Sequence, residues 1–241
     1  MNRLTFLQMT FALSGMAPYL IDKQTTTEIS EALLLGKGNP ELVAPSTPLL
    51  KEVHQAFIQM KEKAAMDGIA IEIVSAYRSY DRQKAIWNRK FSANQKAGLS
   101  PTQNILKIIE YSTLPGTSRH HWGTDIDVID GNAPREGDVL LTEKFHGKGP
   151  YSALRKWMEK HAADFGFLLP YTNNPERKGF YYEPWHYSYA PISKKYLNDY
   201  LKLDLNVVLK TTGLLGKEAL DAAFIKKYIK ENVLGISSTL L

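Results

Sequence analysis

The chain of 241 residues is 44% hydrophobic and 23% charged, carries a net charge of +5 and contains no cysteine. It is long enough to bury a core without covalent cross-links, and the lack of cysteine excludes disulfides, thiolate zinc sites and a cysteine nucleophile. The basic excess is too small for the dense basic stripe of a nucleic-acid-binding protein, so we expect no nucleic-acid partner, whereas an anionic polymer would suit the charge.

The N-terminal segment resembles a weak export signal. Residues 1–3 form a short basic start, and residues 4–20 are mostly apolar but interrupted by Gln8, Thr10 and Ser14. The apolar run is too short and too mixed for a membrane span, so we expect no stable span. We expect residues 1–21 to direct export to the periplasm or cell envelope. The alternative is an amphipathic or buried N-terminal helix.

The first predicted helix follows an irregular lead-in at residues 22–45, which is polar and punctuated by glycine and proline. Thr47 can cap a helix over about 48–66, and Gly68 can end it. Its expected buried stripe comprises Leu49, Val53, Phe57, Met60 and Ala64. Residues 69–75 come next, where isoleucines alternate with other side chains, and this pattern predicts a strand.

A second strand is predicted at about 124–130. Because side chains alternate along a strand, Asp125 and Asp127 share one of its faces. Residues 131–149 form a loop, either the wall or lid of a neighbouring site or a solvated connector. The other expected elements are helices at about 81–97, 103–111, 152–164 and 192–234 (most clearly 217–233), and short strands at 167–169 and 185–189. Strands separated by helices and long loops indicate an α+β fold.

The most informative feature is a set of metal-binding residue types in two short segments, SRHHWGTDID and EPWH: His120, Asp127, Glu183 and His186. Two neutral imidazoles and one carboxylate are typical protein ligands of catalytic zinc, which keeps a fourth position for water. A further carboxylate beside them can serve as the base for the proton of that water. A lone histidine is more often a core or surface residue, and Asp127 alone could cap a turn, but the joint pattern predicts a zinc hydrolase.

Three segments resemble the signatures of one family. SRHHWGTDID fits Ser-x-His-x-x-Gly-x-x-x-Asp, EPWH fits Glu-x-Trp-His, and SAYRSYDRQ fits a Tyr-Arg-Ser segment with a glutamine five residues after the arginine. Over about residues 45–190 the chain thus resembles the VanY-like D-alanyl-D-alanine carboxypeptidases, zinc peptidases of bacterial cell walls. Asp125 departs from the family, which commonly has a small or apolar residue there. It either hydrogen-bonds a ligand, tunes the metal or competes as a ligand, and the motif register favours Asp127.

The resemblance implies a fold and a set of roles. The expected fold is that of the LAS and hedgehog-like peptidases, a small antiparallel central sheet flanked by helices, with one zinc ion at the sheet. His120, Asp127 and His186 would bind the zinc. Glu183 would be the general base and then the proton shuttle. Arg78 would hold the substrate carbonyl or the terminal carboxylate, which suits a planar guanidinium.

By the same resemblance Ser118 and Gln83 would help to bind the terminal carboxylate of the substrate, and Tyr77 and Trp185 are further candidates for substrate contact. Simpler interpretations are a turn serine and a helix-surface glutamine for the first two. Tyr77 is equally compatible with a core position, and Trp185 with packing that fixes its neighbours. We expect an exposed or packing role for His121, with a hydrogen bond beside the site as the alternative.

We expect three regions: the signal at 1–21, a zinc carboxypeptidase domain at 22–191 and a helical C-terminal extension at 192–241. The extension has a basic face formed by Lys194, Lys195, Lys202, Lys210, Lys217, Lys226, Lys227 and Lys230. This extension either packs over the domain, contacts anionic wall or membrane, or mediates a dimer. The oligomeric state is left open.

The function implied is removal of the C-terminal D-alanine from a peptidoglycan stem peptide, the expected partner. Alternatives with the same chemistry are an L,D-carboxypeptidase, a D,D-dipeptidase and an endopeptidase. An alternative of another class is a catalytically silent zinc module that binds the wall, since a fold does not imply a function. Glu183 argues against that module, because a binding protein does not need the base. A cytoplasmic structural protein with accidental motifs would bind no metal.

Overall fold

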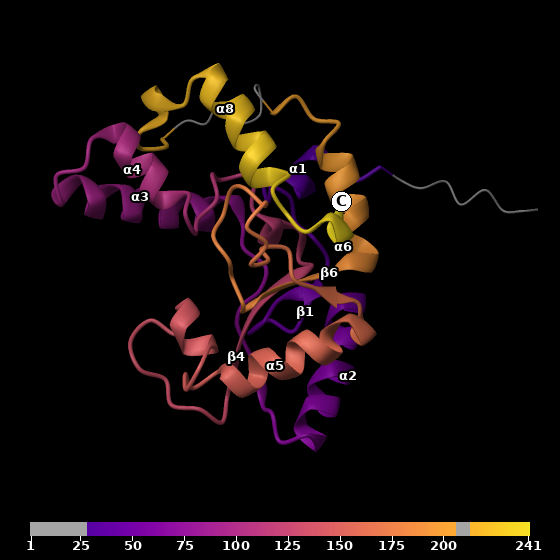
Figure 1. The fold of residues 1–241 in the computed structure, drawn as a ribbon. Helices are drawn as coiled ribbons and strands as arrows, with labels where there is room; N and C mark the ends of the chain where they lie inside the picture. Colours follow the sequence, from indigo (N-terminus) through magenta and orange to yellow (C-terminus); the bar gives the residue numbers. More distant parts are fainter. Residues whose placement is uncertain (1–27, 206–212) are drawn as a thin grey trace, which may run out of the picture.

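The centre of the molecule is a four-stranded antiparallel sheet with the strand order β3-β4-β6-β5. The computed structural model describes residues 28–205 and 213–241, so the predicted signal at 1–21 lies outside the described residues. The strands are β3 (Ile71–Ser75), β4 (Asp125–Asp130), β5 (Phe167–Leu168) and β6 (His186–Tyr189). Helices surround the sheet (Figure 1), which confirms the predicted α+β fold.

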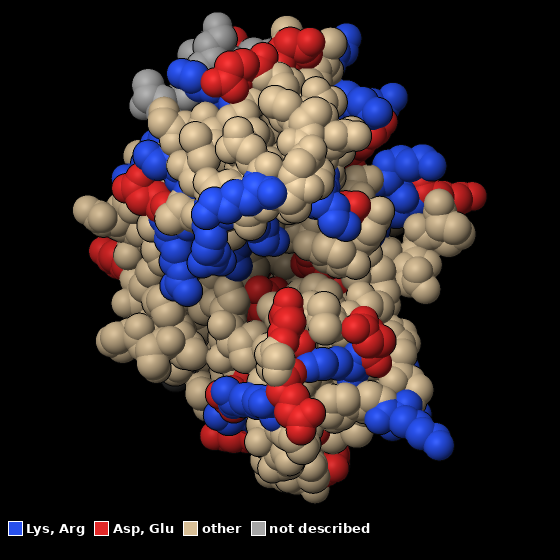
Figure 2. Space-filling model, turned by 90° about the vertical axis from the view of Figure 1, so that its left-hand side faces the viewer, with Lys and Arg blue, Asp and Glu red and all other residues tan. Residues whose placement is uncertain are grey.

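Two groups of helices lie on either side of the sheet region. In Figure 1, α2 (Lys51–Met66) and α5 (Ser152–His161) occupy the lower half. The upper half holds α3 (Tyr80–Lys96), α4 (Pro101–Ile108), α6 (Ala190–Tyr200) and α8 (Ala222–Tyr228). Between the two groups the surface is hollowed, as Figure 2 shows from the side of α3. No helix within the described residues is both long and apolar enough to cross a membrane.

Short elements connect these helices and strands. They are α1 (Glu31–Leu34), β1 (Leu42–Val43), β2 (Leu49–Leu50), the 3-10 turns η1 (Arg119–Trp122), η2 (Thr142–Phe145), η3 (Ala162–Phe165), η4 (Lys217–Ala219) and η6 (Ser238–Leu240), and the π turn η5 (Ile229–Val233). The short element most important for function is η1, because it carries His120, the first candidate metal ligand, just before β4.

The first core lies between the sheet, α2 and α5. The stripe predicted on the first helix is buried in it: Leu49, Val53, Phe57, Met60 and Ala64. Ile73 of β3 and Val128 of β4 belong to the same cluster. Burying one large aliphatic side chain stabilises a fold by about 1.5–3 kcal/mol. This packing therefore holds one face of β4 firmly and leaves its other face for the site.

The first helix begins later than predicted, at Lys51, and Thr47 does not cap it. The N–H of Thr47 closes a turn, and Leu49–Leu50 pairs with Leu42–Val43 in a two-stranded ladder. Because the ladder holds this backbone extended, the helix cannot start there. The described part of the lead-in is also more ordered than predicted, since it contains this strand and the short helix Glu31–Leu34.

The second core joins α3, α4, α6 and α8, and residues 213–241 contribute to it. Its large buried side chains include Trp87, Phe91, Leu197, Tyr200, Ile225 and Tyr228. The hydroxyl of Tyr228 accepts from the N–H of Leu114 at 3.0 Å and lies 2.8 Å from Oγ1 of Thr117. The prediction that the C-terminal segment packs on the rest of the chain is confirmed for these residues, and α8 contacts the segment that leads into η1.

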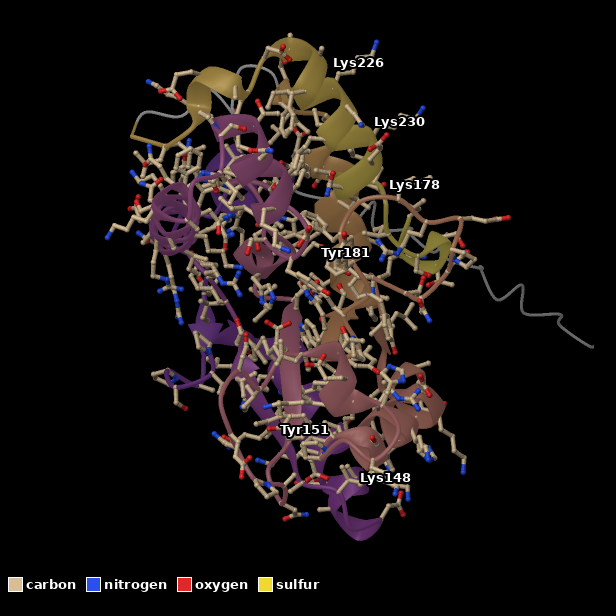
Figure 3. The ribbon with its side chains drawn as sticks, turned by 60° about the vertical axis from the view of Figure 1, so that its left-hand side comes forward. Lys148, Tyr151, Lys178, Tyr181, Lys226 and Lys230 are labelled. Carbon is tan, nitrogen blue, oxygen red and sulfur yellow. The ribbon has the colours of Figure 1, made fainter. Side chains whose placement is uncertain are left out.

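The C-terminal helix is shorter than the predicted stretch at 217–233. The carboxylate of Asp221 accepts the N–H of Phe224 at 2.7 Å, so α8 begins behind this cap. Lys226 and Lys230 point away from the body of the molecule (Figure 3) and are exposed. Of the eight lysines in the predicted basic face, Lys210 lies outside the described residues.

Candidate active site

The pairing of β4 with β6 brings the two motif segments together. In this antiparallel register Asp127 is directly opposite His186, although the two residues are far apart in the chain. The turn η1 delivers His120 from the other side, and it ends at Gly123 with φ of +68°. That left-handed conformation favours glycine, and a Cβ there would lie 2.9 Å from the side chain of Leu42. Gly123 therefore permits the sharp turn that leads from η1 into β4.

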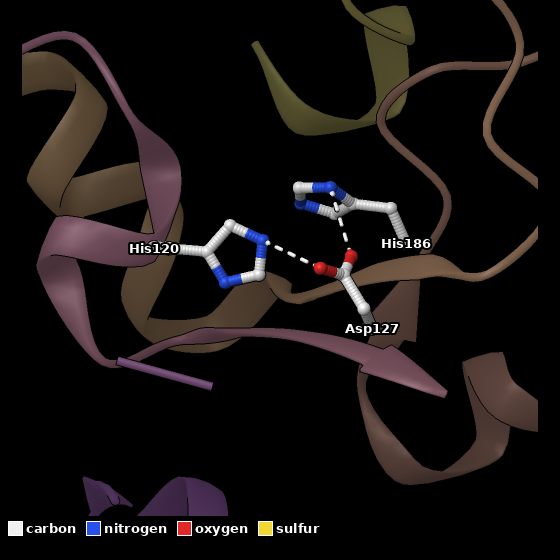
Figure 4. Close-up of side chains that lie close together, drawn as sticks. All are labelled: His120, Asp127 and His186. Atoms are coloured by element: carbon white, nitrogen blue, oxygen red, sulfur yellow. Dashed lines mark ion pairs between the residues drawn. The ribbon is translucent and has the colours of Figure 1, made fainter. Parts of the chain in front are cut away.

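His120, Asp127 and His186 form a buried cluster with the geometry of a metal site (Figure 4). One possible ligand atom from each residue lies within 4.8 Å of the others. Nε2 of His120 is 3.3 Å from Oδ2 of Asp127, and Nδ1 of His186 is 3.4 Å from Oδ1. No hydrogen bond reaches this buried Oδ1. A buried carboxylate oxygen that lacks a donor between two imidazoles fits a divalent cation such as zinc.

Contacts on the far side of each ring determine which nitrogen faces the cluster. Nδ1 of His120 lies 2.8 Å from the carbonyl oxygen of Ala76, and Nε2 of His186 lies 3.0 Å from Oδ1 of Asp125. When these nitrogens donate, Nε2 of His120 and Nδ1 of His186 are left for a metal. Burial disfavours a charged His186, but hydrogen bonds to Asp125 and Glu183 outweigh it and raise its pKa to about 10. A metal at Nδ1 would therefore displace a proton.

Asp125 is the centre of a fully buried polar network and not a member of the metal cluster. It accepts from Nε of Arg119 at 3.0 Å, from the hydroxyl of Thr124 at 2.6 Å and from the hydroxyl of Ser188 at 3.0 Å. Burial opposes its ionisation, but the guanidinium of Arg119 and the contact with His186 hold the pKa of Asp125 well below its usual range. Of the interpretations left open for Asp125, the structure shows a hydrogen bond to a candidate ligand.

Glu183 lies beside the cluster. Its Oε2 is 3.0 Å from Nδ1 of His186, and its side chain is buried. The backbone N–H of Glu183 donates to the carbonyl of Tyr171 and its carbonyl accepts from the N–H of His186, so the segment is held in a tight turn. Burial raises the pKa of Glu183 above its ordinary value. A carboxylate with a raised pKa takes up a proton more readily than an exposed glutamate does.

Arg78 reaches the site from the segment after β3. Its Nη1 donates to Oε1 of Gln83 at 2.8 Å and its Nη2 to the hydroxyl of Ser75 at 2.9 Å, while Nη2 lies 3.9 Å from Oδ2 of Asp127. The amide of Gln83 also donates to the carbonyl of Thr113 at 2.9 Å. Gln83 is fully buried, so it acts on the orientation of Arg78, and the helix-surface interpretation of this residue is wrong.

His121 makes hydrogen bonds beside the site, which is the alternative interpretation of this residue. Its ring is 1% exposed, so an exposed position is excluded. Nδ1 lies 2.5 Å from the carbonyl oxygen of Arg78, and Nε2 accepts the N–H of Gly116 at 3.0 Å. Burial lowers the pKa of His121 to about 3, and the neutral ring can serve as donor on one side and acceptor on the other. It thereby ties the Arg78 segment to the turn that precedes Ser118.

A cavity of about 470 Å³ opens onto the cluster. Its lining includes seven of the nine site residues expected from the sequence: Arg78, Ser118, His120, Asp127, Glu183, Trp185 and His186. Gln83 does not line it, and Tyr77 lines a separate hollow, so direct substrate contact by these two stays a prediction. Residues 140–143 form part of the lining, so the loop at 131–149 provides a wall of the cavity. Tyr171, which no motif indicates, also lines it and packs edge-on against His186.

Comparison with known proteins points to one family. A family model described as "VanY: D-alanyl-D-alanine carboxypeptidase" matches residues 46–192. YodJ of Bacillus subtilis (strain 168), a putative carboxypeptidase, is 33% identical over 141 residues, which are 58% of this chain and 45% of that protein. A D-alanyl-D-alanine carboxypeptidase of Enterococcus faecalis is 27% identical over 148 residues, 61% of this chain and 47% of that protein. The chain thus spans about half the length of these two relatives.

Solved structures show the same fold at low sequence identity. VanYB in complex with D-alanine-D-alanine superimposes with a TM-score of 0.53 and 22% identity, covering 73% of this chain and 91% of that chain. A mutant of the vancomycin resistance D,D-pentapeptidase VanY in complex with Zn(II) gives a TM-score of 0.51 and 22% identity, covering 75% and 88%. These likenesses concern the arrangement of helices and strands.

Proposed function

The chain belongs to the family of VanY D-alanyl-D-alanine carboxypeptidases, and from this premise we propose that it is a zinc-dependent carboxypeptidase that removes the C-terminal D-alanine from peptidoglycan stem peptides. The observation that carries the proposal is the buried group of His120, Asp127 and His186, with Glu183 in the same cavity. A module that only binds cell wall has no use for a buried carboxylate of raised pKa beside its metal ligands.

One zinc ion would be held by Nε2 of His120, a carboxylate oxygen of Asp127 and Nδ1 of His186. When bound, zinc supplies Lewis acidity, which polarises a carbonyl and lowers the pKa of a coordinated water toward neutrality. Glu183 accepts the proton of the attacking water and then donates it to the nitrogen of the departing D-alanine. Its burial favours the first step, because the raised pKa makes Glu183 a better proton acceptor than an exposed glutamate.

Arg78 and Ser118 position the peptide in this proposal. The guanidinium of Arg78 is held by Gln83 and Ser75, so it can present its remaining N–H groups to the peptide carbonyl or the terminal carboxylate without first becoming ordered. Ser118 lines the cavity near the cluster and can donate its hydroxyl to the same carboxylate. Trp185 forms an apolar wall, packed against Phe145.

Two related matters belong to the same proposal. We propose that the protein acts after export to the periplasm or cell envelope, where its substrate would be found. The same chemistry can remove a terminal D-alanine from a pentapeptide or from a tetrapeptide, so an L,D-carboxypeptidase is the second candidate. A dipeptidase or an endopeptidase would use the same groups and would differ only in the position of the cleaved bond relative to the end of the peptide.

The test is digestion of stem pentapeptide and tetrapeptide by the wild-type protein, by Glu183→Gln and by Glu62→Gln, a control that removes an exposed carboxylate of α2 outside the cavity. We expect the wild type and the control to release one alanine, as read by mass spectrometry. Glu183→Gln should retain zinc, as read by elemental analysis, and lose about 10²–10⁴-fold in kcat.

The peptide that the wild type consumes distinguishes D,D from L,D activity. If the wild type holds zinc but cleaves neither peptide, the carboxypeptidase proposal fails and a binding module takes its place. If Glu183→Gln turns over at the wild-type rate, Glu183 is not the base.

A further inference from the structure

The cavity at the candidate active site has a basic wall and an acidic rim. Figure 2 shows Lys and Arg side chains gathered on one side of the hollow, and Asp and Glu side chains among further Lys and Arg on the other. The lining includes Arg89 and Lys90 of α3 and, from the loop after β4, Asp138 and Glu143. Opposite charges across a cleft orient a ligand that carries both signs.

Lys90 is a half-buried cation in the lining of this cavity. Its Nζ donates to the hydroxyl of Ser112 at 2.6 Å, which leaves other N–H groups of the ammonium for a ligand. In the described part of the chain, no carboxylate oxygen lies within 4.0 Å of the charged groups of Lys90 or Arg89. Burial lowers the pKa of Lys90, and the charges of Glu183 and Arg78 act on it with opposite signs, which places the ammonium within electrostatic reach of the catalytic groups.

The two other arginines of the cavity lining face carboxylates of the protein. Arg119 pairs with Asp125 at 3.0 Å, and Arg78 lies 3.9 Å from Asp127. In the proposed function Arg78 also binds the peptide carbonyl or the terminal carboxylate of the substrate. The basic wall therefore offers more positive charge than one carboxylate of a substrate requires, and holding a partly buried ammonium without a counter-ion has a desolvation cost.

We propose that Lys90, together with Arg89, binds a second carboxylate of the peptide substrate, distinct from its C-terminal carboxylate. This inference rests on the proposed peptidase function. The acidic rim formed by Asp138 and Glu143 faces the same cavity and favours an ammonium group. The substrate class is thus a peptide with a side chain that ends in both a carboxylate and an ammonium, and a plain lysine side chain lacks the first of these.

The test uses three stem pentapeptides that differ only in the third residue: diaminopimelate, its side-chain carboxamide, and lysine. Each is assayed for kcat/KM with the wild type, Lys90→Met, Lys90→Arg and Lys96→Met, which removes an exposed lysine of the same helix outside the cavity. Binding is measured by calorimetry in the zinc-loaded Glu183→Ala protein, with and without Lys90→Met, so that affinity is obtained without turnover.

We expect the wild type to prefer the free carboxylate over its carboxamide by about tenfold or more, because charge-assisted hydrogen bonds are about twice as strong as neutral ones. Lys90→Met should abolish this preference in both kcat/KM and affinity, Lys90→Arg should restore most of it, and Lys96→Met should leave it unchanged. Melting curves would show whether Lys90→Met is folded, and Lys90→Arg keeps the test valid if it is not.

Other outcomes overturn one proposal or the other. Equal binding of the free and amidated peptides by the zinc-loaded Glu183→Ala protein removes the second subsite. An equal loss on all three peptides in Lys90→Met assigns Lys90 to a carboxylate that all three peptides share and also overturns the proposal. If the free carboxylate is still bound more tightly than its carboxamide but the wild type cleaves neither peptide, the subsite stands and the carboxypeptidase proposal fails.

Discussion

At the scale of single residues, Asp125 differs in role from Asp127 although the two share one face of β4. Asp127 lies between the two imidazoles with one oxygen free of hydrogen bonds, whereas every acceptor contact of Asp125 is directed to a protein donor. The alternation along a strand predicts their common face but not this division. The difference in role arises because the side chains of Arg119 and Ser188 occupy the space around Asp125.

Asp125→Asn should weaken zinc binding by about 10–100-fold, because a carboxylate behind a ligating imidazole fixes its orientation and raises its basicity. The contact at stake is the 3.0 Å hydrogen bond to Nε2 of His186. Affinity is measured by competition with a chromophoric chelator, on protein shown by circular dichroism to be folded. The control Asp138→Asn removes an exposed acid that lines the cavity and should not change the affinity. Unchanged zinc affinity in Asp125→Asn would show that His186 is oriented without it.

At the scale of helices and strands, periodic patterns predict the elements that bury an apolar face. They do not predict the boundaries that are set by hydrogen bonds to distant backbone groups. The strand at β4 and the stripe on α2 follow from alternation and from helical spacing. The start of α2 does not, because the β1–β2 ladder holds residues 49–50 extended. The motifs indicate the cluster of candidate ligands, but the contacts of His121 join residues that are 43 positions apart and leave no local signal.

Asp199 illustrates how one acid connects two elements. On α6 it accepts from Lys195 and from Lys202, both at 2.7 Å, and from the N–H of Ile29 just before α1 at 3.3 Å. Hydrogen bonds from the two lysines hold the pKa of Asp199 well below its usual range. Its stabilising effect is therefore fully present above the pKa of the unfolded chain and is lost as the pH falls toward the lower folded value.

We expect Asp199→Asn to lower the free energy of unfolding at pH 7 and to make it fall less steeply below about pH 4, the ordinary range of an aspartate. Urea unfolding at pH 7, 4 and 3 measures this. Asp164→Asn is the matched control, since that side chain is 71% exposed and its removal should leave the pH profile unchanged. Parallel profiles for wild type and Asp199→Asn would mean that the two lysines do not perturb this carboxyl group in solution.

At the scale of the whole molecule, the site lies where two separately packed cores meet. The sheet core supplies Asp127 and His186, while the segment before His120 is held from the other side by Tyr228 and His121. Neither core alone brings the three ligands together. A metal ion would therefore join the two halves and bind the folded chain far better than the unfolded chain.

Zinc should raise the melting temperature, and a chelator should reverse the effect. A ligand at about 100 times its dissociation constant stabilises the folded state by about 2.7 kcal/mol, which in a domain of this size corresponds to roughly 5–11 °C. Scanning calorimetry of metal-free protein with added zinc measures the shift. Magnesium, which prefers oxygen ligands, should have little effect, and His120→Ala should lose most of the zinc shift because it removes one of three ligands. An equal shift in His120→Ala would place the stabilising zinc elsewhere on the protein.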